Sequence, residues 1–185
     1  MFQNRYLRTY YDTAQICKGK HLINKHANSH PESNLKRCSK CGQETYTACP
    51  ICSEPIRGCK HTDFEKFTSG NMITGSINTR IFTHCQSEPY EIPLYCQCGS
   101  PYPWTEAMLN EFDEIIDMAD ELNDDEKIIL KEKFPQLLID STGTTSAALR
   151  ISKILKSAEF TTIQALKSAV ASKIAGHALE LLGWK

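Results

Sequence analysis

The second half of the chain has the apolar periodicity of amphipathic helices. Apolar residues recur at three- and four-residue steps over Met108–Leu122, which predicts a first helix with Thr105 as its N-cap. Asn123, followed three residues later by Glu126, has the form of a capping box and predicts a second helix that Pro135 interrupts. The same periodicity predicts two more helices, about four in all: one that starts at Thr144 or Thr145, and one from about Thr161 to Leu182.

The first half of the chain has little helical periodicity and many turn signals. Brief strand-like runs at Gln15–Cys17, Leu22–Ile23 and Met72–Phe82 are separated by Gly, Pro and Asn residues. So few large apolar residues make a weak core, whereas bound zinc adds its binding energy directly to folding. The pattern predicts a small α+β protein: a double zinc ribbon of short β-hairpins and metal knuckles over residues 1–103, followed by an α-helical region over 104–185.

Cysteine usage in the chain points to bound metal. There are nine cysteines, all at or before Cys98, and the first residues show no apolar stretch of the kind found in secretory signals. A cytoplasmic location is therefore expected, where thiols stay reduced and paired cysteines bind metal more often than they form disulfides. No run of residues is long and apolar enough to predict a transmembrane segment.

Two cysteine pairs have the spacing of zinc knuckles. Cys38 and Cys41 lie in the string CSKCG, and Cys49 and Cys52 lie in CPIC, so that each pair of sulfurs reaches one tetrahedral ion from a tight turn. Only seven residues separate Cys41 from Cys49, which is short for a hairpin that brings the two knuckles face to face. Each pair is therefore expected to have another partner.

The partner expected for CSKCG is the upstream string CKGKH. This string carries Cys17 and His21 around a glycine turn, and 16 residues separate His21 from Cys38. Such spacing is typical of a zinc ribbon. The sequence therefore predicts a first zinc site formed by Cys17, His21, Cys38 and Cys41.

The partner expected for CPIC is the string CQCG near the end of the first half. One residue separates the two cysteines of CQCG, where a standard knuckle has two. Two zinc ions per chain are then expected. The predicted second site is an all-thiolate one formed by Cys49, Cys52, Cys96 and Cys98.

The 43 residues between CPIC and CQCG contain further donor side chains. These donors would replace a ligand of CQCG, form a third metal site, or lie apart without a metal ion in common. The last interpretation is favoured, because C-x-H and an adjacent H-C pair are not ordinary knuckles. His26 and His30, in a polar run, are expected to be solvated loop residues. The donors in question are Cys59, His61, His84 and Cys85.

Several strings taken together resemble a known family. They are YYDTAQIC at residues 10–17, CSKCG, CPIC, and GSPYPWTE at 99–106. These strings resemble an uncharacterised bacterial family, a domain of unknown function with zinc-ribbon character. The resemblance implies a double zinc ribbon with cysteines at the four knuckle positions, and it implies no activity. Two features depart from the family pattern: CQC stands where C-x2-C is expected, and the segment 59–85 is longer than expected.

The sequence favours a binding role over catalysis. A zinc ion with four protein ligands is closed, whereas a catalytic zinc keeps an open position, and the chain has no metalloprotease, esterase or phosphate-loop motif. No small-molecule substrate is therefore expected. We expect a non-enzymatic protein whose zinc ribbons present a protein–protein interaction surface and whose helical tail mediates association with a partner or with itself.

The alternative function is a nucleic-acid-binding zinc-ribbon module. Residues 1–100 carry 12 Lys and Arg against 8 Asp and Glu, whereas residues 101–185 carry 9 against 14. The first half is mildly basic, but the formal net charge of −1 lacks the strongly basic footprint of many nucleic-acid-binding proteins. The cations and rings nearest the knuckles, which such a module would use, are Lys36, Arg37, Lys40, Arg57, Lys60, Tyr46, Tyr95, Tyr102 and Trp104.

Overall fold

The protein folds as two compact units that differ in secondary structure. The computed structural model describes residues 5–71, 76–85, 89–139, 141–156, 158–170 and 176–184. Met1–Tyr102 forms the first unit, which contains the β-strands, and Pro103–Lys185 forms the second, which is helical. The protein is therefore of the small α+β type with antiparallel sheets. The chain passes between units after Tyr102, one residue before the boundary expected from the sequence.

The first sheet is small and has the strand order β3-β2-β4. In it, β2 (Gln15–Cys17) lies between β3 (Leu22–Asn24) and β4 (Thr45–Tyr46) and is antiparallel to both. Ile16 and Cys17 of β2 are fully buried. The strands predicted at residues 15–17 and 22–23 are confirmed, and their shortness means that little apolar surface holds this sheet together.

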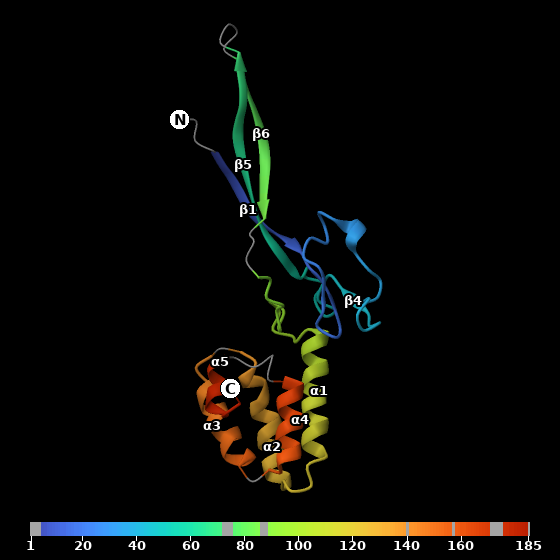
Figure 1. Ribbon diagram of the computed structural model, residues 1–185, viewed down its shortest axis with the longest axis vertical. Coiled ribbons are helices and arrows are strands. Elements are labelled where there is room, and N and C mark those ends of the chain that lie inside the picture. Colours follow the sequence, from blue (N-terminus) through green and yellow to red (C-terminus); the bar gives the residue numbers. More distant parts are fainter. Residues whose placement is uncertain are drawn as a thin grey trace. The chain divides into compact units, whose positions relative to one another are not determined.

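The second sheet is longer and has the strand order β1-β5-β6, with β1 (Arg5–Thr13) and β6 (Ser76–Cys85) at its edges. Figure 1 shows β5 (Arg57–Asn71) and β6 as a long antiparallel hairpin, with β1 along the other side of β5. Side chains alternate between two faces along each strand, so the paired residues of neighbouring strands share a face. On β5 the odd-numbered residues from Cys59 to Asp63 are buried, whereas the even-numbered ones from Lys60 to Phe64 are half-buried.

The sequence pattern did not predict the strands β1 and β5. Both strands carry charged and aromatic residues without a clean apolar alternation, and most of the residues of β1 are exposed. The predicted run Met72–Phe82 covers part of β6, and residues 72–75 lie outside the described part of the chain. Cross-strand pairing, and not a hydrophobic pattern, defines this sheet.

The second unit is a bundle with five α-helices among its described residues. They are α1 (Pro103–Asp117), α2 (Asp124–Lys133), α3 (Thr144–Leu155), α4 (Phe160–Val170) and α5 (Gly176–Leu181). The last predicted helix corresponds to α4 and α5, between which residues 171–175 lie outside the description. None of the described helices is long and apolar enough to span a membrane. Two short 3-10 turns accompany these elements, η1 (Pro31–Ser33) in the first unit and η2 (Phe134–Leu137) after α2.

Local sequence signals set two of the helix starts. The side chain of Asn123 accepts a hydrogen bond from the N–H of Glu126, whose carboxylate accepts one from the N–H of Asn123, so the predicted capping box is confirmed. The prediction that Thr105 caps the first helix is wrong. That helix starts at Pro103, whose fixed φ suits a first turn, and Thr105 is fully buried inside it.

Two stacked rings mark the core of the helical unit. Phe112 of α1 and Phe134 of η2 lie parallel with 3.6 Å between ring centroids, and each is 1% exposed. Ile116, Leu130 and Ile151 are also almost fully buried. The stripe predicted from three- and four-residue steps therefore supplies the core of this unit.

Glu121 makes the helical unit sensitive to acid. Its carboxylate accepts a hydrogen bond from the N–H of Glu159 (3.0 Å) at the start of α4, and this bond lowers the pKa of Glu121. A lowered folded pKa stabilises the protein above the unfolded value, about 4.3, and the stabilisation is lost as pH falls through the folded value. Glu121→Gln should therefore lower Tm by a few degrees at pH 7, with a difference from wild type that shrinks towards pH 3. Thermal unfolding at several pH values measures this, and Glu111→Gln, at an exposed position of α1, should show no such trend.

Candidate metal centres

The first predicted cluster starts from the hairpin between β2 and β3. Cys17 ends β2, and the chain turns back through Lys20, whose φ of 63° is left-handed, to place His21 just before β3. The N–H of Cys17 donates to the carbonyl of His21 (3.0 Å), and the N–H of His21 donates to the Cys17 sulfur (3.2 Å). The hairpin therefore directs one thiol and one imidazole towards the same point.

Cys38 and Cys41 complete this cluster from a tight turn that precedes β4. The N–H of Gly42 donates to the carbonyl of Cys38 (2.8 Å), and Gly42 has a φ of 70°, a conformation that favours glycine. Burial raises the pKa of the Cys38 thiol, but hydrogen bonds from the N–H groups of Lys40 and Cys41 and from nearby thiols outweigh burial and lower this pKa to about 6. Cys38 is therefore well prepared to act as a thiolate donor.

The donor atoms of the first cluster lie at the distances that a tetrahedral zinc ion requires. With Zn–S bonds of about 2.3 Å and Zn–N bonds of about 2.0–2.1 Å, two sulfurs lie about 3.8 Å apart, and a sulfur and a nitrogen about 3.6 Å apart. The sulfurs of Cys17 and Cys41 are 3.7 Å apart. Nδ1 of His21 is 3.5 Å from the Cys17 sulfur and 3.6 Å from the Cys38 sulfur. The four side chains predicted for the first site are thus brought together with a spacing that fits zinc.

The CPIC turn repeats the geometry of the CSKCG turn. The N–H of Cys49 donates to the carbonyl of Glu54, and the N–H of Ser53 donates to the carbonyl of Cys49, both at 2.9 Å. Ser53, with a φ of 62°, takes the position that glycine has in CSKCG. A hydrogen bond from the N–H of Cys52 is the main cause that lowers the pKa of the Cys49 thiol. The turn therefore favours the thiolate form of Cys49.

The CQCG segment forms a different turn, as its shorter spacing requires. The N–H of Gly99 donates to the carbonyl of Cys96, and the N–H of Cys96 donates to the carbonyl of Ser100, both at 2.9 Å. The side chain and the N–H of Ser100 both donate to the sulfur of Cys98 and lower the pKa of this thiol to about 6. In the CSKCG knuckle, N–H groups of the turn donate to the Cys38 sulfur. In CQCG, the side chain and the N–H of Ser100 donate to the Cys98 sulfur instead.

The two halves of the second cluster meet at similar distances. The sulfurs of Cys49 and Cys98 are 3.9 Å apart, and those of Cys52 and Cys96 are 3.5 Å apart, against about 3.8 Å for two thiolates on one zinc ion. Each cluster thus offers four protein donors that could hold one metal ion. An ion held by four protein ligands has no position for a substrate or a reactive water, so both donor sets suit a structural metal.

Three of the four remaining donors, Cys59, His61 and Cys85, come together in the structure, contrary to the expectation from the sequence. Cys59 and Cys85 form a disulfide, and His61 lies within 4.8 Å of them by its nearest donor atom. The fourth member is His26, which is half-buried, contrary to the expectation of a solvated loop residue, whereas His84 is exposed and lies on the opposite face of the sheet. Strand geometry explains the difference, because C-x-H spacing places both side chains on one face of a strand.

The rings that the sequence analysis placed beside the knuckles do not form a stacking surface. Tyr102 and Trp104 are only 4% and 2% exposed, and Tyr46 and Tyr95 are half-buried. The burial of Tyr102 and Trp104 agrees with packing of these rings within the protein and argues against the alternative in which they stack on nucleic acid.

Comparison with known families identifies a family to which this chain is similar. Over residues 10–76 and 68–178 the chain matches the family described as "Uncharacterized protein conserved in bacteria (DUF2321)". The matched residues include all eight side chains of the two predicted clusters. The resemblance to an uncharacterised bacterial family is therefore confirmed. No curated protein and no solved structure matches the chain.

Each of the two clusters is expected to bind one ion independently of the other. Cys38→Ser removes a thiolate from the first cluster and should lower the zinc content by about one ion per chain, and Cys96→Ser should do the same for the second. Elemental analysis of protein purified without added metal measures the loss. Ser39→Ala, which changes the residue beside Cys38 without removing a donor, is the matched control. A Cys38→Ser protein with unchanged zinc content would show that the first cluster is not a metal site.

Proposed function

The chain belongs to the bacterial family DUF2321, and we propose that it is a non-enzymatic, zinc-stabilised module that binds single-stranded nucleic acid on one face of the β1-β5-β6 sheet. Two zinc ions hold the scaffold in this proposal, and exposed rings and cations form the binding face. The closed donor sets of the two clusters support a structural and not a catalytic role for the metal.

The scaffold depends on metal because its strands are short. The strands β2, β3 and β4 have three residues or fewer, and each cluster joins two turns in the manner of a zinc ribbon. Structural zinc contributes about 10–16 kcal/mol of apparent binding energy in small zinc domains at pH 7, which exceeds what such strands gain from burial. Thiolate ligands bind metal only while they are reduced, and a cytoplasmic location, where thiols stay reduced, is part of this proposal.

The proposed binding face is the side of the second sheet opposite the buried donors of β5. Phe64 of β5 pairs with Tyr6 of β1 and with Phe82 of β6, so three rings form a row across three strands. The rings of Phe64 and Phe82 stack with 5.9 Å between centroids, while Tyr6 is 62% exposed and Phe82 is 41% exposed. We call this surface the aromatic face; its residues are Tyr6, Thr9, Tyr11, Lys60, Thr62, Phe64, Lys66, Arg80, Phe82 and His84.

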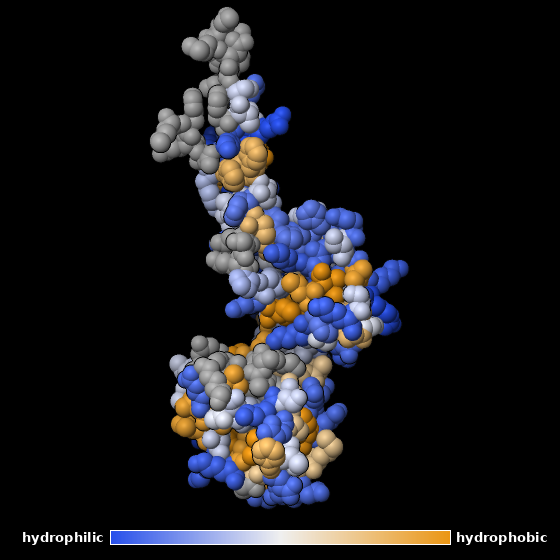
Figure 2. All heavy atoms as spheres, in the orientation of Figure 1, coloured by the Kyte–Doolittle hydropathy of each residue, from blue (hydrophilic) through white to orange (hydrophobic). Residues whose placement is uncertain are grey.

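The charged groups of the aromatic face have one sign. Lys60, Lys66 and Arg80 lie among the rings, and the guanidinium of Arg57 lies over the Tyr11 ring, 5.1 Å from its centroid. The acidic residues of β5 point to the opposite face, so no carboxylate lies on the aromatic face among the described strand residues. Figure 2 shows apolar side chains set among hydrophilic ones along this sheet. Such a face attracts phosphates to its cations and offers rings on which unpaired bases stack.

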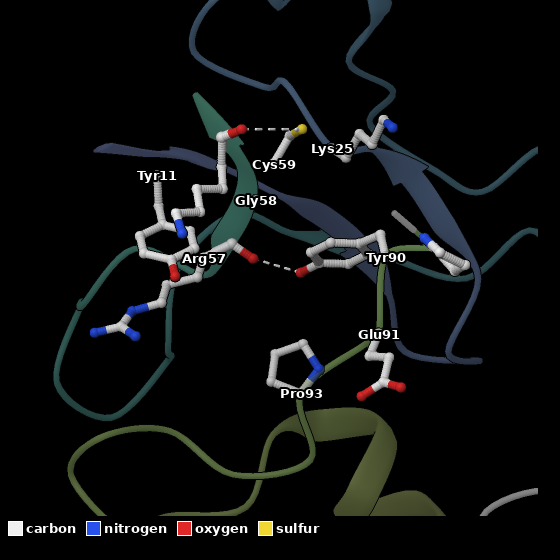
Figure 3. Close-up of a pocket in the computed structure, with 10 residues that line it drawn as sticks. Tyr11, Lys25, Arg57, Gly58, Cys59, Tyr90, Glu91 and Pro93 are labelled. Carbon is white, nitrogen blue, oxygen red and sulfur yellow. Dashed lines mark hydrogen bonds between the residues drawn. The ribbon is translucent and has the colours of Figure 1, made fainter. Parts of the chain in front are cut away.

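A pocket of about 610 Å³ extends the aromatic face at its Tyr11 end. In Figure 3 the Tyr90 ring forms one wall, with its hydroxyl bonded to the carbonyl of Arg57, while the Arg57 side chain extends away from Tyr90. Three cations and one carboxylate line the pocket, so its charge also favours an anionic group. The charged and aromatic lining residues are Tyr11, Lys25, Arg57, Lys60, Tyr90 and Glu91.

The helical unit offers a second candidate function, association with a protein. Phe160 and Met118 are 74% and 72% exposed, and Met118 also borders a shallow groove of about 180 Å³ with Ile115 and Ala165. Scattered apolar side chains are common on monomer surfaces, so Phe160 and Met118 do not by themselves mark an interface. The aromatic face is therefore the observation that carries the proposal.

Removal of one ring from the aromatic face should weaken binding of a labelled oligo(dT) or oligo(U). Stacking of one base is worth about 1–3 kcal/mol, so Phe82→Ala should raise Kd by roughly 5- to 150-fold. Ile81→Ala is the matched control, because Ile81 is the neighbouring residue, is 66% exposed and points to the opposite face. Fluorescence anisotropy measures both. Equal effects of the two substitutions would contradict a role for the aromatic face.

Salt dependence tests the contribution of the cations. We assume that Arg57, Lys60, Lys66 and Arg80 each neutralise one phosphate. The logarithm of the association constant should then fall linearly with the logarithm of the salt concentration, and the slope should be about −3. Lys66→Gln should make this slope shallower by about 0.7, whereas Lys153→Gln in α3 should leave it unchanged. Absence of binding to both oligonucleotides at low salt would reject the nucleic-acid proposal and leave association through the helical unit.

A further inference from the structure

A third donor cluster converges from three segments of the first unit. One donor atom from each of His26, Cys59, His61 and Cys85 lies within 4.8 Å of the others. Cys59 and His61 share the buried face of β5, and Cys85, the last residue of β6, pairs with His61 across the hairpin. His26 lies in the loop after β3, where the carbonyl of Lys25 accepts a hydrogen bond from the N–H of Cys59 (2.9 Å).

Backbone packing sets the position of His26 against β5. A Cβ at Gly58 would lie 2.4 Å from the carbonyl oxygen of Lys25 and 2.8 Å from that of Thr13. Only glycine permits this close approach of the loop to the strand. The arrangement of His26 beside Cys59 is therefore built into the fold of the first unit.

The two imidazoles face each other and the sulfur of Cys85. Nδ1 of His26 is 3.0 Å from Nε2 of His61, and Nε2 of His26 is 3.8 Å from the sulfur of Cys85. The side chain of His61 is 7% exposed, and its Nδ1 has no hydrogen-bond partner among the described residues. A buried ring nitrogen without a partner is costly, and a bound ion removes that cost by coordinating an imidazole.

Asp12 places a buried carboxylate behind the two rings. Its side chain is 1% exposed, and Oδ1 accepts hydrogen bonds from the N–H groups of Thr13 (2.6 Å) and Asn28 (3.1 Å). Oδ2 is buried without a hydrogen-bond partner in the described part of the chain and lies 3.8 Å from Nδ1 of His26 and from Nε2 of His61. Metal-bound histidines commonly donate their second N–H to a carboxylate, and Asp12 is placed for that role.

We propose that His26, Cys59, His61 and Cys85 form a third zinc site, which binds one ion when both thiols are reduced and releases it when they form the disulfide. Two thiolates and two imidazoles are a tetrahedral donor set that suits zinc. In the disulfide form the two sulfurs are bonded to each other and no longer act as thiolate ligands. The site does not depend on nucleic-acid binding, because its donors on β5 and β6 point away from the aromatic face.

A peroxide is the class of oxidant that balances the release step. Two thiolates lose two electrons and form one S–S bond, and the O–O bond of hydrogen peroxide breaks as it takes up those electrons. Two protons convert the two peroxide oxygens, each of which already carries one hydrogen, into two water molecules. The zinc ion keeps its charge and dissociates, because the two imidazoles alone hold it weakly.

Zinc content of the full chain in two redox states tests this site. After reduction with a phosphine, the chain should hold about one zinc ion more than after limited peroxide treatment. Peptide mass spectrometry should find the Cys59–Cys85 disulfide only in the oxidised form. Cys85→Ser should abolish the redox-dependent ion, whereas His84→Ala, which alters the exposed neighbour on the opposite face, should keep it.

Two further measurements distinguish loss of zinc binding at this site from general unfolding of a variant. Asp12→Asn leaves all four donors in place and should weaken the zinc affinity of this site by about 10- to 100-fold. Cobalt titration needs no substitution, and the reduced wild-type chain should take up about one more Co²⁺ in tetrahedral coordination than the oxidised chain. Equal metal uptake by the two forms, or full zinc content in Cys85→Ser, would overturn the third site.

Discussion

The fold of the first unit depends on cysteine and histidine side chains from distant parts of the chain coming together in clusters. The second cluster joins Cys49 and Cys52 to Cys96 and Cys98, and the 43 residues between these pairs include the whole β5–β6 hairpin. A hairpin that is exposed over much of its length cannot anchor itself through a core. In the function we propose, a metal ion bound by these four cysteines holds the two ends of this long insertion together, and the proposed binding face and third site both rely on it.

Because side chains alternate along β5, its neighbouring residues lie on opposite faces of the second sheet. Cys59, His61 and Asp63 point to the buried face, where they meet the end of β6 and the loop after β3. Lys60 and Phe64 point to the other face, with the rings and cations of β1 and β6. One strand therefore carries the donors of the proposed third metal site on one face and residues of the proposed binding surface on the other, and neighbouring residues belong to different faces.

The two kinds of cysteine in this chain differ in how their sulfurs are supported. In the knuckles, backbone N–H groups of the same tight turn point at the first thiol, and they lower the pKa of Cys38 and Cys49. Cys59 and Cys85 come from neighbouring strands and lack such a turn, so the position of each depends on strand pairing. Local geometry thus lowers the pKa of these knuckle thiols, whereas strand pairing brings Cys59 and Cys85 close enough to form a disulfide, on which the proposed redox-dependent site rests.

The sequence by itself determined the features that arise within a few residues. The knuckle turns, the hairpin that carries Cys17 and His21, the capping box of Asn123 and the helical stripes all follow from local spacing, because turn and helix geometry relate positions at most four or five residues apart. Only the tertiary structure decided that β1, β5 and β6 pair, that His26 and not His84 joins Cys59, and that the exposed rings gather on one face. The register between strands sets those relations, and a shift of one residue would exchange the two faces of the sheet.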